Sequence, residues 1–216
     1  SIAALGQGGE YWLALLAEVQ AARELSEQAG REYRVDAMLW SQGEADYLEG
    51  TSRDDYREYL LKMYEDFSQA VMDITGQPDK PIIVTYQSAS HRALGTRSPE
   101  IAYAQKDAAD AHPHIYLSGP MYHLNHNKNG MHLEADSSLM LGKYYGKVLK
   151  SVLYDKEPWV PLQPVAVNWA DQSVDIVLSV THGPLAMEKS SVAQAPNYGF
   201  DIWDEHDELI GDIIES

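Results

Sequence analysis

The stretch WSQGEAD, from Trp40 to Asp46, sets an amide, a glycine and two carboxylates at the end of a segment that reads as a β-strand, residues 33–40. In α/β enzymes, ligands bind outside the carboxyl ends of the strands. The stretch therefore predicts an α/β protein whose chemistry lies at this strand end.

Outward from this stretch, helical and strand patterns alternate up to about residue 154. Apolar residues at helical spacing predict helices, and Ser98-Pro99-Glu100 reads as a helix start with serine as N-cap and proline at the first helical position. The short run Ile82–Val84 is typical of a parallel strand covered on both faces. We expect strands at 1–5, 33–40, 81–87 and 114–118, and helices at about 12–30, 54–76, 99–111 and 135–153. This order implies parallel β-α-β units.

The pattern changes after Tyr154. Pro158, Pro161 and Pro164 interrupt the chain, and residues 174–180, 200–203 and 209–214 then read as strands. We therefore expect a domain at 1–154 and a small β-rich extension at 155–216. The extension could be incomplete at its C-terminal end.

The composition narrows the classes of function. Thirty-three acidic and 16 basic residues give a net charge of −17, which opposes binding to nucleic acid or to anionic membranes. The chain has no cysteine, which excludes disulfides and thiol nucleophiles. No apolar run approaches the ~20 residues of a membrane span. An uncharged sugar fits this balance better than a nucleic acid or a lipid surface.

Three motifs carry candidate groups for ester hydrolysis, which needs a nucleophile, a base, an orienting acid and oxyanion donors. Gln42 offers a side-chain NH2 to the oxyanion, and Gly8 or Gly9 offers a backbone N–H. His132, in the sequence NGMHL at 129–133, is the candidate general base. We expect these groups to converge at one edge of the sheet.

The WSQGEAD and NGMHL blocks resemble the W-x-Q-G-E-[SA]-[ND] and D-x-x-H blocks of the SGNH hydrolase superfamily, and within it the sialate O-acetylesterase-like carbohydrate esterases. The resemblance covers about 6–153. It implies a three-layer α/β/α sandwich with a parallel sheet, of the flavodoxin-like SGNH type. It also implies a serine esterase with an acyl-enzyme intermediate and neither metal nor organic cofactor, in which Gln42 and Gly8 or Gly9 are the oxyanion donors.

The acid that orients His132 is open between two residues. The resembling families usually have an aspartate three residues before the histidine, where this chain has Asn129. Some relatives use the glutamate of the Q-G-E block instead, which is Glu44 here. We favour Glu44 over Asn129. The simpler alternative is that Glu44 and Asp46 only cap a helix or hold a loop.

The nucleophile has no candidate in the family's context. Its serine normally lies in a G-D-S or G-Q-S-N block, and neither occurs here; Ser41, Ser88 and Ser90 lie at strand ends outside such a block. Either the serine lies upstream of Ser1 in a longer protein or this copy has lost it. We favour the first, because residues 1–5 read like the interior of a strand.

The substrate side has weaker candidates. Trp40, Tyr47 and Tyr122 could form a platform for a sugar ring, with Asp46 beside it, although core packing is the default for Trp40. Three nearby histidines are candidate metal ligands: His123, His126 and His132. They lack the helical spacing of an H-E-x-x-H motif. We therefore expect no metal.

The leading hypothesis is a carbohydrate O-acetylesterase acting on an acetylated glycan. The alternative is a non-catalytic carbohydrate-binding or structural module, such as part of a phage tail adhesin or cell-surface protein. We expect no nucleic-acid partner and no membrane insertion, a contribution from the upstream segment, and possible homo-oligomers. A secreted, cell-surface or virion-associated location is favoured over the cytoplasm.

Overall fold

A computed structural model describes residues 1–5, 8–95, 98–170, 173–180, 183–186, 200–204, 206 and 209–210. The chain divides into two compact units, Ser1–Thr181 and His182–Ser216. Each unit is described by itself, and the expected domain limit at 154/155 stays a prediction.

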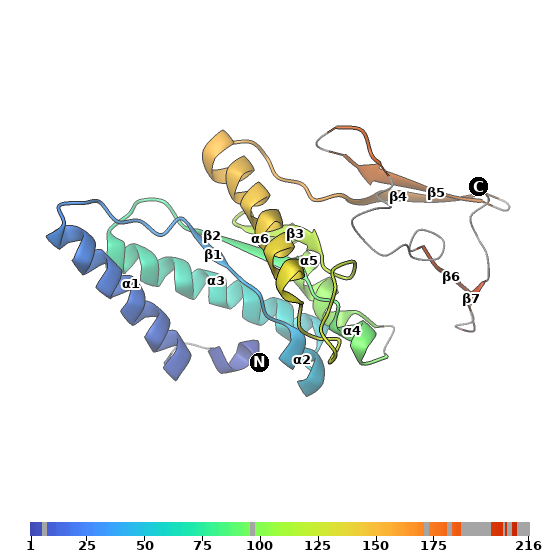
Figure 1. Ribbon diagram of the computed structural model, residues 1–216, viewed down its shortest axis with the longest axis horizontal. Helices are drawn as coiled ribbons and strands as arrows, with labels where there is room; N and C mark the ends of the chain where they lie inside the picture. Colours follow the sequence, from blue (N-terminus) through green and yellow to red (C-terminus); the bar gives the residue numbers. More distant parts are fainter. Residues whose placement is uncertain are drawn as a thin grey trace. The chain divides into compact units, whose positions relative to one another are not determined.

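The first unit is built on a parallel sheet of three strands, β1 (Ala37–Leu39), β2 (Ile82–Gln87) and β3 (Ile115–Pro120), in the order β1-β2-β3 (Figure 1). Ala37 pairs with Ile82, and Ile83 pairs with Ile115. The central strand β2 is buried from Ile82 to Tyr86. Burial on both faces explains its continuous apolar run, as the sequence predicted.

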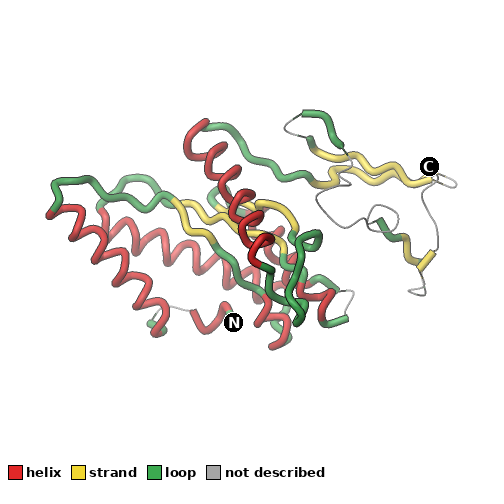
Figure 2. The backbone as a smooth tube through the Cα atoms, in the orientation of Figure 1, coloured by secondary structure: helices red, strands yellow, loops and turns green. Residues whose placement is uncertain are grey.

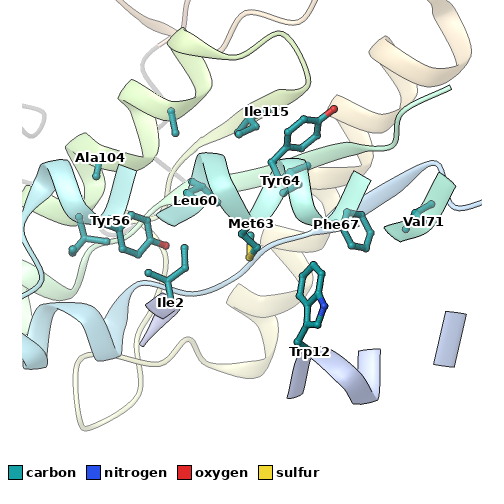
Figure 3. Packing of buried hydrophobic residues seen from close by; sticks show 13 residues of the cluster. Ile2, Trp12, Tyr56, Leu60, Met63, Tyr64, Phe67, Val71, Ala104 and Ile115 are labelled. Carbon is teal, nitrogen blue, oxygen red and sulfur yellow. The ribbon is translucent and has the colours of Figure 1, made fainter. Parts of the chain in front are cut away.

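Helices cover both faces of this sheet (Figure 2). The structure has α1 at Glu10–Gln28, α3 at Arg53–Thr75 and α5 at Glu100–Ala111, and α6 at Ala135–Leu149, which continues as a π-helix, η2, at Lys150–Asp155. Ile83 faces the cluster formed with α1, α3 and α5, which includes Leu60 and Phe67 (Figure 3). Val84 faces α6, where it packs with Leu141 and Val148. Two cores on opposite faces of one sheet confirm the predicted α/β sandwich.

The residues at the two ends of α3 determine where this helix begins and ends. Ser52 is its N-cap and accepts the Asp55 backbone N–H at 3.1 Å, which satisfies one of the free donors of the first turn. Gly76 ends the helix with φ +72°, in the left-handed region that favours glycine. Both boundaries lie within two residues of those predicted.

The structure differs from the predictions in several elements, and the strand expected at 33–40 is confined to Ala37–Leu39. Residues Ile2–Leu5 form a 3-10 helix, η1, and not a strand, because the Ile2 N–H binds the Asp46 side chain and not a neighbouring strand. Ser98 does not cap α5: Pro99 occupies the N-cap position, and the Ser98 hydroxyl donates to the Glu100 carboxylate. Two short helices, α2 (Glu44–Glu49) and α4 (Ser90–Ala93), were not predicted.

The first unit also contains an antiparallel hairpin of β4 (Gln163–Ala170) and β5 (Ser173–Ser179). The sequence predicted β5 but missed β4, because Pro164 suggested an interruption. A register shift between Pro164 and Ala166 shows how the strand accommodates the proline, as at other β-bulges. In the second unit, β6 (Ile202–Trp203) pairs with β7 (Leu209–Ile210); the predicted strand residues 211–214 lie outside the described residues.

Candidate active site

The segments that follow the three parallel strands lie at the same edge of the sheet (Figure 1). WSQGEAD leads from β1 into α2, α4 follows β2, and the loop that carries His132 follows β3. The short helices α2 and α4 are in contact. The loop approaches α4 so closely that a Cβ added to Gly130 would lie 2.9 Å from the Ala93 Cβ. The sheet therefore supports all three segments at one place.

Asp46 is the fully buried centre of this region. Its relative exposure is 0%, and its carboxylate accepts hydrogen bonds from the Ile2 backbone N–H at 3.0 Å, the Thr51 hydroxyl at 3.0 Å and the Gln42 side-chain amide. A carboxylate removed from water is stable only when donors surround it. Because no oxygen of Asp46 reaches the surface, the geometry argues against the direct substrate contact predicted for it.

Gln42 is held at both ends of its side chain. Nε2 donates to Asp46, and the Tyr56 hydroxyl lies 3.2 Å from Oε1 and 2.9 Å from the backbone carbonyl oxygen of Gln42. The carbonyl also accepts from the Gln105 side chain at 2.9 Å. An amide NH2 carries two donors, so the second N–H of Gln42 remains after the bond to Asp46.

Gly43 lets the chain pass close to α5. Its φ is +151°, which strongly favours glycine. A Cβ at this position would lie 2.9 Å from the Ile101 Cγ2 atom and 3.0 Å from the Gln105 Nε2 atom. The central glycine of Q-G-E is therefore required by conformation and by space.

Glu44 is anchored to the end of β2. Its Oε1 accepts the Tyr86 hydroxyl at 2.9 Å and the Ser88 hydroxyl at 3.4 Å, and Ser88 in turn lies 2.9 Å from the Ser90 hydroxyl. Burial first, and the nearby Glu44 second, raise the pKa of Tyr86 far above its usual value. The phenol is thus held as a proton donor to the carboxylate.

His132 is exposed, and its ring meets Asn129. The Asn129 Nδ2 atom lies 2.9 Å from the His132 Nδ1 atom. The Asn129 Oδ1 atom accepts the backbone N–H groups of Met131 at 2.8 Å and of His132 at 3.1 Å. Of the two candidate orienting residues, the geometry favours Asn129, because the Glu44 carboxylate is hydrogen-bonded at the end of β2.

Ser41 and Trp40 are tied to α6. The Tyr145 hydroxyl donates to the Trp40 carbonyl at 3.1 Å and lies 2.9 Å from the Ser41 hydroxyl. The Trp40 indole is partly buried against the first core cluster, and its N–H lies 3.4 Å from the Tyr56 hydroxyl. This packing matches the default reading of Trp40 and argues against a sugar platform at this residue.

Tyr47 lines a cavity of about 330 Å³, together with Thr51, Ser52, Arg53 and Leu94 among others. Thr51 also donates to Asp46, so the cavity adjoins the network that holds Gln42. Burial raises the pKa of Tyr47 to about 12. Tyr122 is 53% exposed and makes an edge contact with His123 at 5.7 Å between ring centroids.

The glycine pair immediately precedes α1. Gly8 is exposed with φ +91°, and Gly9 is the N-cap of α1, whose carbonyl accepts the Leu13 N–H at 3.0 Å. The pair therefore follows a 3-10 helix, where the sequence predicted a strand. The bond between Ile2 and Asp46 ties the segment ahead of the glycines to WSQGEAD.

The other two loop histidines have their own partners. His123 Nε2 lies 3.0 Å from the Tyr144 hydroxyl, and His126 Nδ1 lies 2.8 Å from the Leu124 carbonyl. Within the described ranges, no three or more histidine or carboxylate side chains are grouped for a metal ion.

Several residues of this network were missed by sequence reasoning. Tyr56 and Gln105 hold Gln42, and Thr51 and Ile2 hold Asp46. Of these residues, only Gln105 could have been noticed in the sequence, because it is a polar residue within an otherwise apolar stripe on α5. The buried residues of that stripe are Ile101, Ala102, Ala104, Gln105 and Ala108.

Comparison with known proteins identifies the family of this chain. The model of a family described as carbohydrate esterase, sialic acid-specific acetylesterase, matches residues 4–151. The chain belongs to this carbohydrate esterase family. The matched span contains WSQGEAD, Asn129 and His132, which supports an acetylesterase of carbohydrates at the level of the family.

A solved structure shares the fold of this esterase family member. It is an X-ray structure of a protein from Arabidopsis thaliana, with a TM-score of 0.54 and 15% sequence identity, over 68% of this chain and 55% of that one. At this identity the likeness concerns the fold alone, and the chain spans about half the length of the plant protein. No curated protein sequence matches the chain. In the parts described, every helix is too short or too polar to cross a membrane.

Proposed function

We propose that this chain forms part of the active site of a serine esterase that removes O-acetyl groups from a carbohydrate. His132 acts as general base, Asn129 positions its ring, and Gln42 donates to the oxyanion together with the backbone N–H of Gly8 or Gly9. The observation that carries the proposal is the fixed Gln42 amide at the carboxyl end of β1, since a preorganised donor is what oxyanion stabilisation requires.

The proposed reaction has two steps. The serine Oγ attacks the acetyl carbonyl while His132 takes its proton, and the negative charge develops on the oxygen facing Gln42. The C–O bond to the sugar then breaks, His132 gives its proton to the departing sugar oxygen, and the acetyl group stays on the serine. Water, activated by the same histidine, releases acetate and restores the serine.

The nucleophile is proposed to come from a segment outside residues 1–216. Ser88 and Ser90 are each only 2% exposed and bond to each other, so neither hydroxyl is placed to attack a substrate. Ser41 is exposed, but its hydroxyl is paired with Tyr145. A serine brought by another segment would need only to reach His132, which lies at the surface.

The sugar is proposed to be uncharged. The family is described as sialic acid-specific, but the net charge of −17 disfavours the approach of an anionic sugar such as a sialic acid. The Arg53 guanidinium in the neighbouring cavity is already paired with Asp107 through bonds of 2.6 and 2.9 Å, and Glu100 also lines that cavity.

Treatment of the full-length protein with a fluorophosphonate probe tests this proposal. We expect one labelled serine, located by peptide mass spectrometry, and loss of the label in His132→Ala. His112→Ala is the matched control, because His112 precedes β3 at the other end of the strand and binds Glu65; it should keep the label. A folded full-length protein without any label would contradict the proposal and favour the binding or structural module.

A further inference from the structure

The side-chain amide of Asn129 has only one acceptable orientation. Its Oδ1 atom receives two backbone N–H groups, from Met131 and His132, at 2.8 and 3.1 Å. Rotating the amide by half a turn would place its NH2 group against those two donors and leave all of them without acceptors. The NH2 end of Asn129, and not its oxygen, therefore faces the imidazole.

The loop around Asn129 is closed on itself, which keeps this orientation in place. The Asn127 N–H donates to the His132 carbonyl at 2.8 Å, and the Asn127 side chain accepts the Asn129 N–H at 3.1 Å. Gly130, with φ +70°, completes the turn and abuts Ala93. These contacts hold the backbone N–H groups of Met131 and His132 toward the Asn129 Oδ1 atom, so the amide cannot turn without losing both hydrogen bonds.

We infer that Asn129 fixes neutral His132 as the tautomer protonated at Nε2. The Asn129 Nδ2 atom lies 2.9 Å from the His132 Nδ1 atom, and an amide NH2 can only donate. The Nδ1 atom must therefore be the acceptor, and the single proton of the neutral ring lies on Nε2. The tautomer itself follows from this contact and the two hydrogen bonds to Oδ1, whereas its consequence for catalysis rests on the proposed function.

This tautomer is the reverse of the one that a general base needs. In a serine triad, a carboxylate accepts the Nδ1–H, and the lone pair of Nε2 takes the serine proton. Here the lone pair lies on Nδ1, facing Asn129, and Nε2 presents a proton. Moving the proton to Nδ1, or adding a second one, sets an N–H of the ring against the NH2 of Asn129. Asn129 is thus a positioning residue that slows the proposed reaction.

An aspartate at this position would reverse the tautomer. One carboxylate oxygen of Asn129→Asp can keep the N–H groups of Met131 and His132, and the other can accept an Nδ1–H. In serine triads, replacing the aspartate by asparagine holds the wrong tautomer and lowers kcat by about 10⁴-fold. We therefore expect Asn129→Asp to increase the esterase rate of the full-length protein by between about tenfold and about 10⁴-fold.

Nitrogen-15 NMR of the histidine ring tests the inference without any need for activity. Long-range ¹H–¹⁵N correlations, recorded where the imidazoles are neutral, distinguish a protonated Nδ1 from a protonated Nε2, and the His132 signals are those that disappear in His132→Ala. Asn127→Asp is the matched control: it adds the same charge to the same loop and keeps an oxygen acceptor for the Asn129 N–H, without touching the ring.

The expected result is Nε2–H in the unmodified protein and in Asn127→Asp, and Nδ1–H in Asn129→Asp. Nδ1–H in the unmodified protein, or an unchanged pattern in Asn129→Asp, would overturn the inference. If the tautomer changes as expected but no full-length variant hydrolyses an acetyl ester, the proposed function fails while the role of Asn129 stands.

Discussion

The buried carboxylate of Asp46 accepts a hydrogen bond from the side-chain amide of Gln42, so the last residue of WSQGEAD fixes the residue proposed to bind the oxyanion. The same carboxylate binds Ile2 and Thr51. One acid therefore connects the start of the chain, the beginning of α2 and the loop ahead of α3. Its loss should affect stability and the proposed site together.

Asp46→Asn should lower the free energy of unfolding by about 2–4 kcal/mol, because an amide NH2 would face at least one buried donor and leave it unpaired. Urea unfolding measures this change. Asp54→Asn is the control: Asp54 is exposed in the first turn of α3, where losing the charge should cost less than about 1 kcal/mol. Equal losses in the two variants would show that Asp46 is not the connecting group described here.

Gly43→Ala should destabilise the protein by about 2–4 kcal/mol, from backbone strain at φ +151° and from contact with Ile101 and Gln105. Gly142→Ala is the matched control. Gly142 lies exposed in α6 with nothing within 4 Å of an added Cβ, so alanine should stabilise the helix by up to about 1 kcal/mol. Thermal unfolding should give shifts of opposite sign, and a neutral Gly43→Ala would contradict the close approach to α5.

The sequence predicted the parallel β-α-β units well because their signals are local. The buried run of β2 and the capped ends of α3 each follow from a few neighbouring residues, such as Ser52 and Gly76. The failures are non-local. Residues 1–5 have a strand-like composition, but Ile2 is bound by a carboxylate 44 positions away. The β4 strand was missed because a bulge absorbs Pro164.

The candidate site also has parts that the sequence predicted and parts that depend on contacts between distant residues. Residue types identified Gln42 and His132 as groups with suitable chemistry, and the structure places their segments at one edge of the sheet. The sequence pattern could not decide whether Glu44 or Asn129 is the partner of the His132 imidazole, because both side chains can accept a hydrogen bond. The choice depends on the hydrogen-bond partners of each side chain. Glu44 accepts a hydrogen bond from Tyr86, and Asn129 presents its NH2 group to the His132 ring.

The contact between Glu44 and Tyr86 should appear as a coupling energy in a double-mutant cycle. Glu44→Ala, Tyr86→Phe and the double variant should give a coupling of about 1–3 kcal/mol, because the phenol of buried Tyr86 donates to a carboxylate at 2.9 Å. The exposed pair Gln69 and Asp73, on the surface of α3, is the comparison. Its cycle should give only about 0.2–0.5 kcal/mol. Additive effects of Glu44→Ala and Tyr86→Phe would mean that Glu44 is not held by β2.

Stability should fall steeply in alkali, because burial raises the pKa of Tyr56, Tyr86 and Tyr145 above the ordinary phenol value of about 10. Between that value and the raised ones, the unfolded chain loses protons that the folded chain keeps. The free energy of unfolding then decreases as pH rises, by about 1.4 kcal/mol per pH unit for each tyrosine. These three tyrosines should together contribute a slope of about 4 kcal/mol per unit above pH ~10.5.

Urea unfolding at a series of pH values from about 9 to 11.5 measures that slope. Tyr86→Phe removes one of the protons retained on folding, so its slope should be shallower by about 1.4 kcal/mol per unit, whatever its stability at pH ~9. Tyr11→Phe, at a position that is 72% exposed, should leave the slope unchanged. If Tyr86→Phe keeps the full slope, the Tyr86 phenol ionises as readily in the folded protein as in the unfolded chain, and its bond to Glu44 cannot be holding the proton.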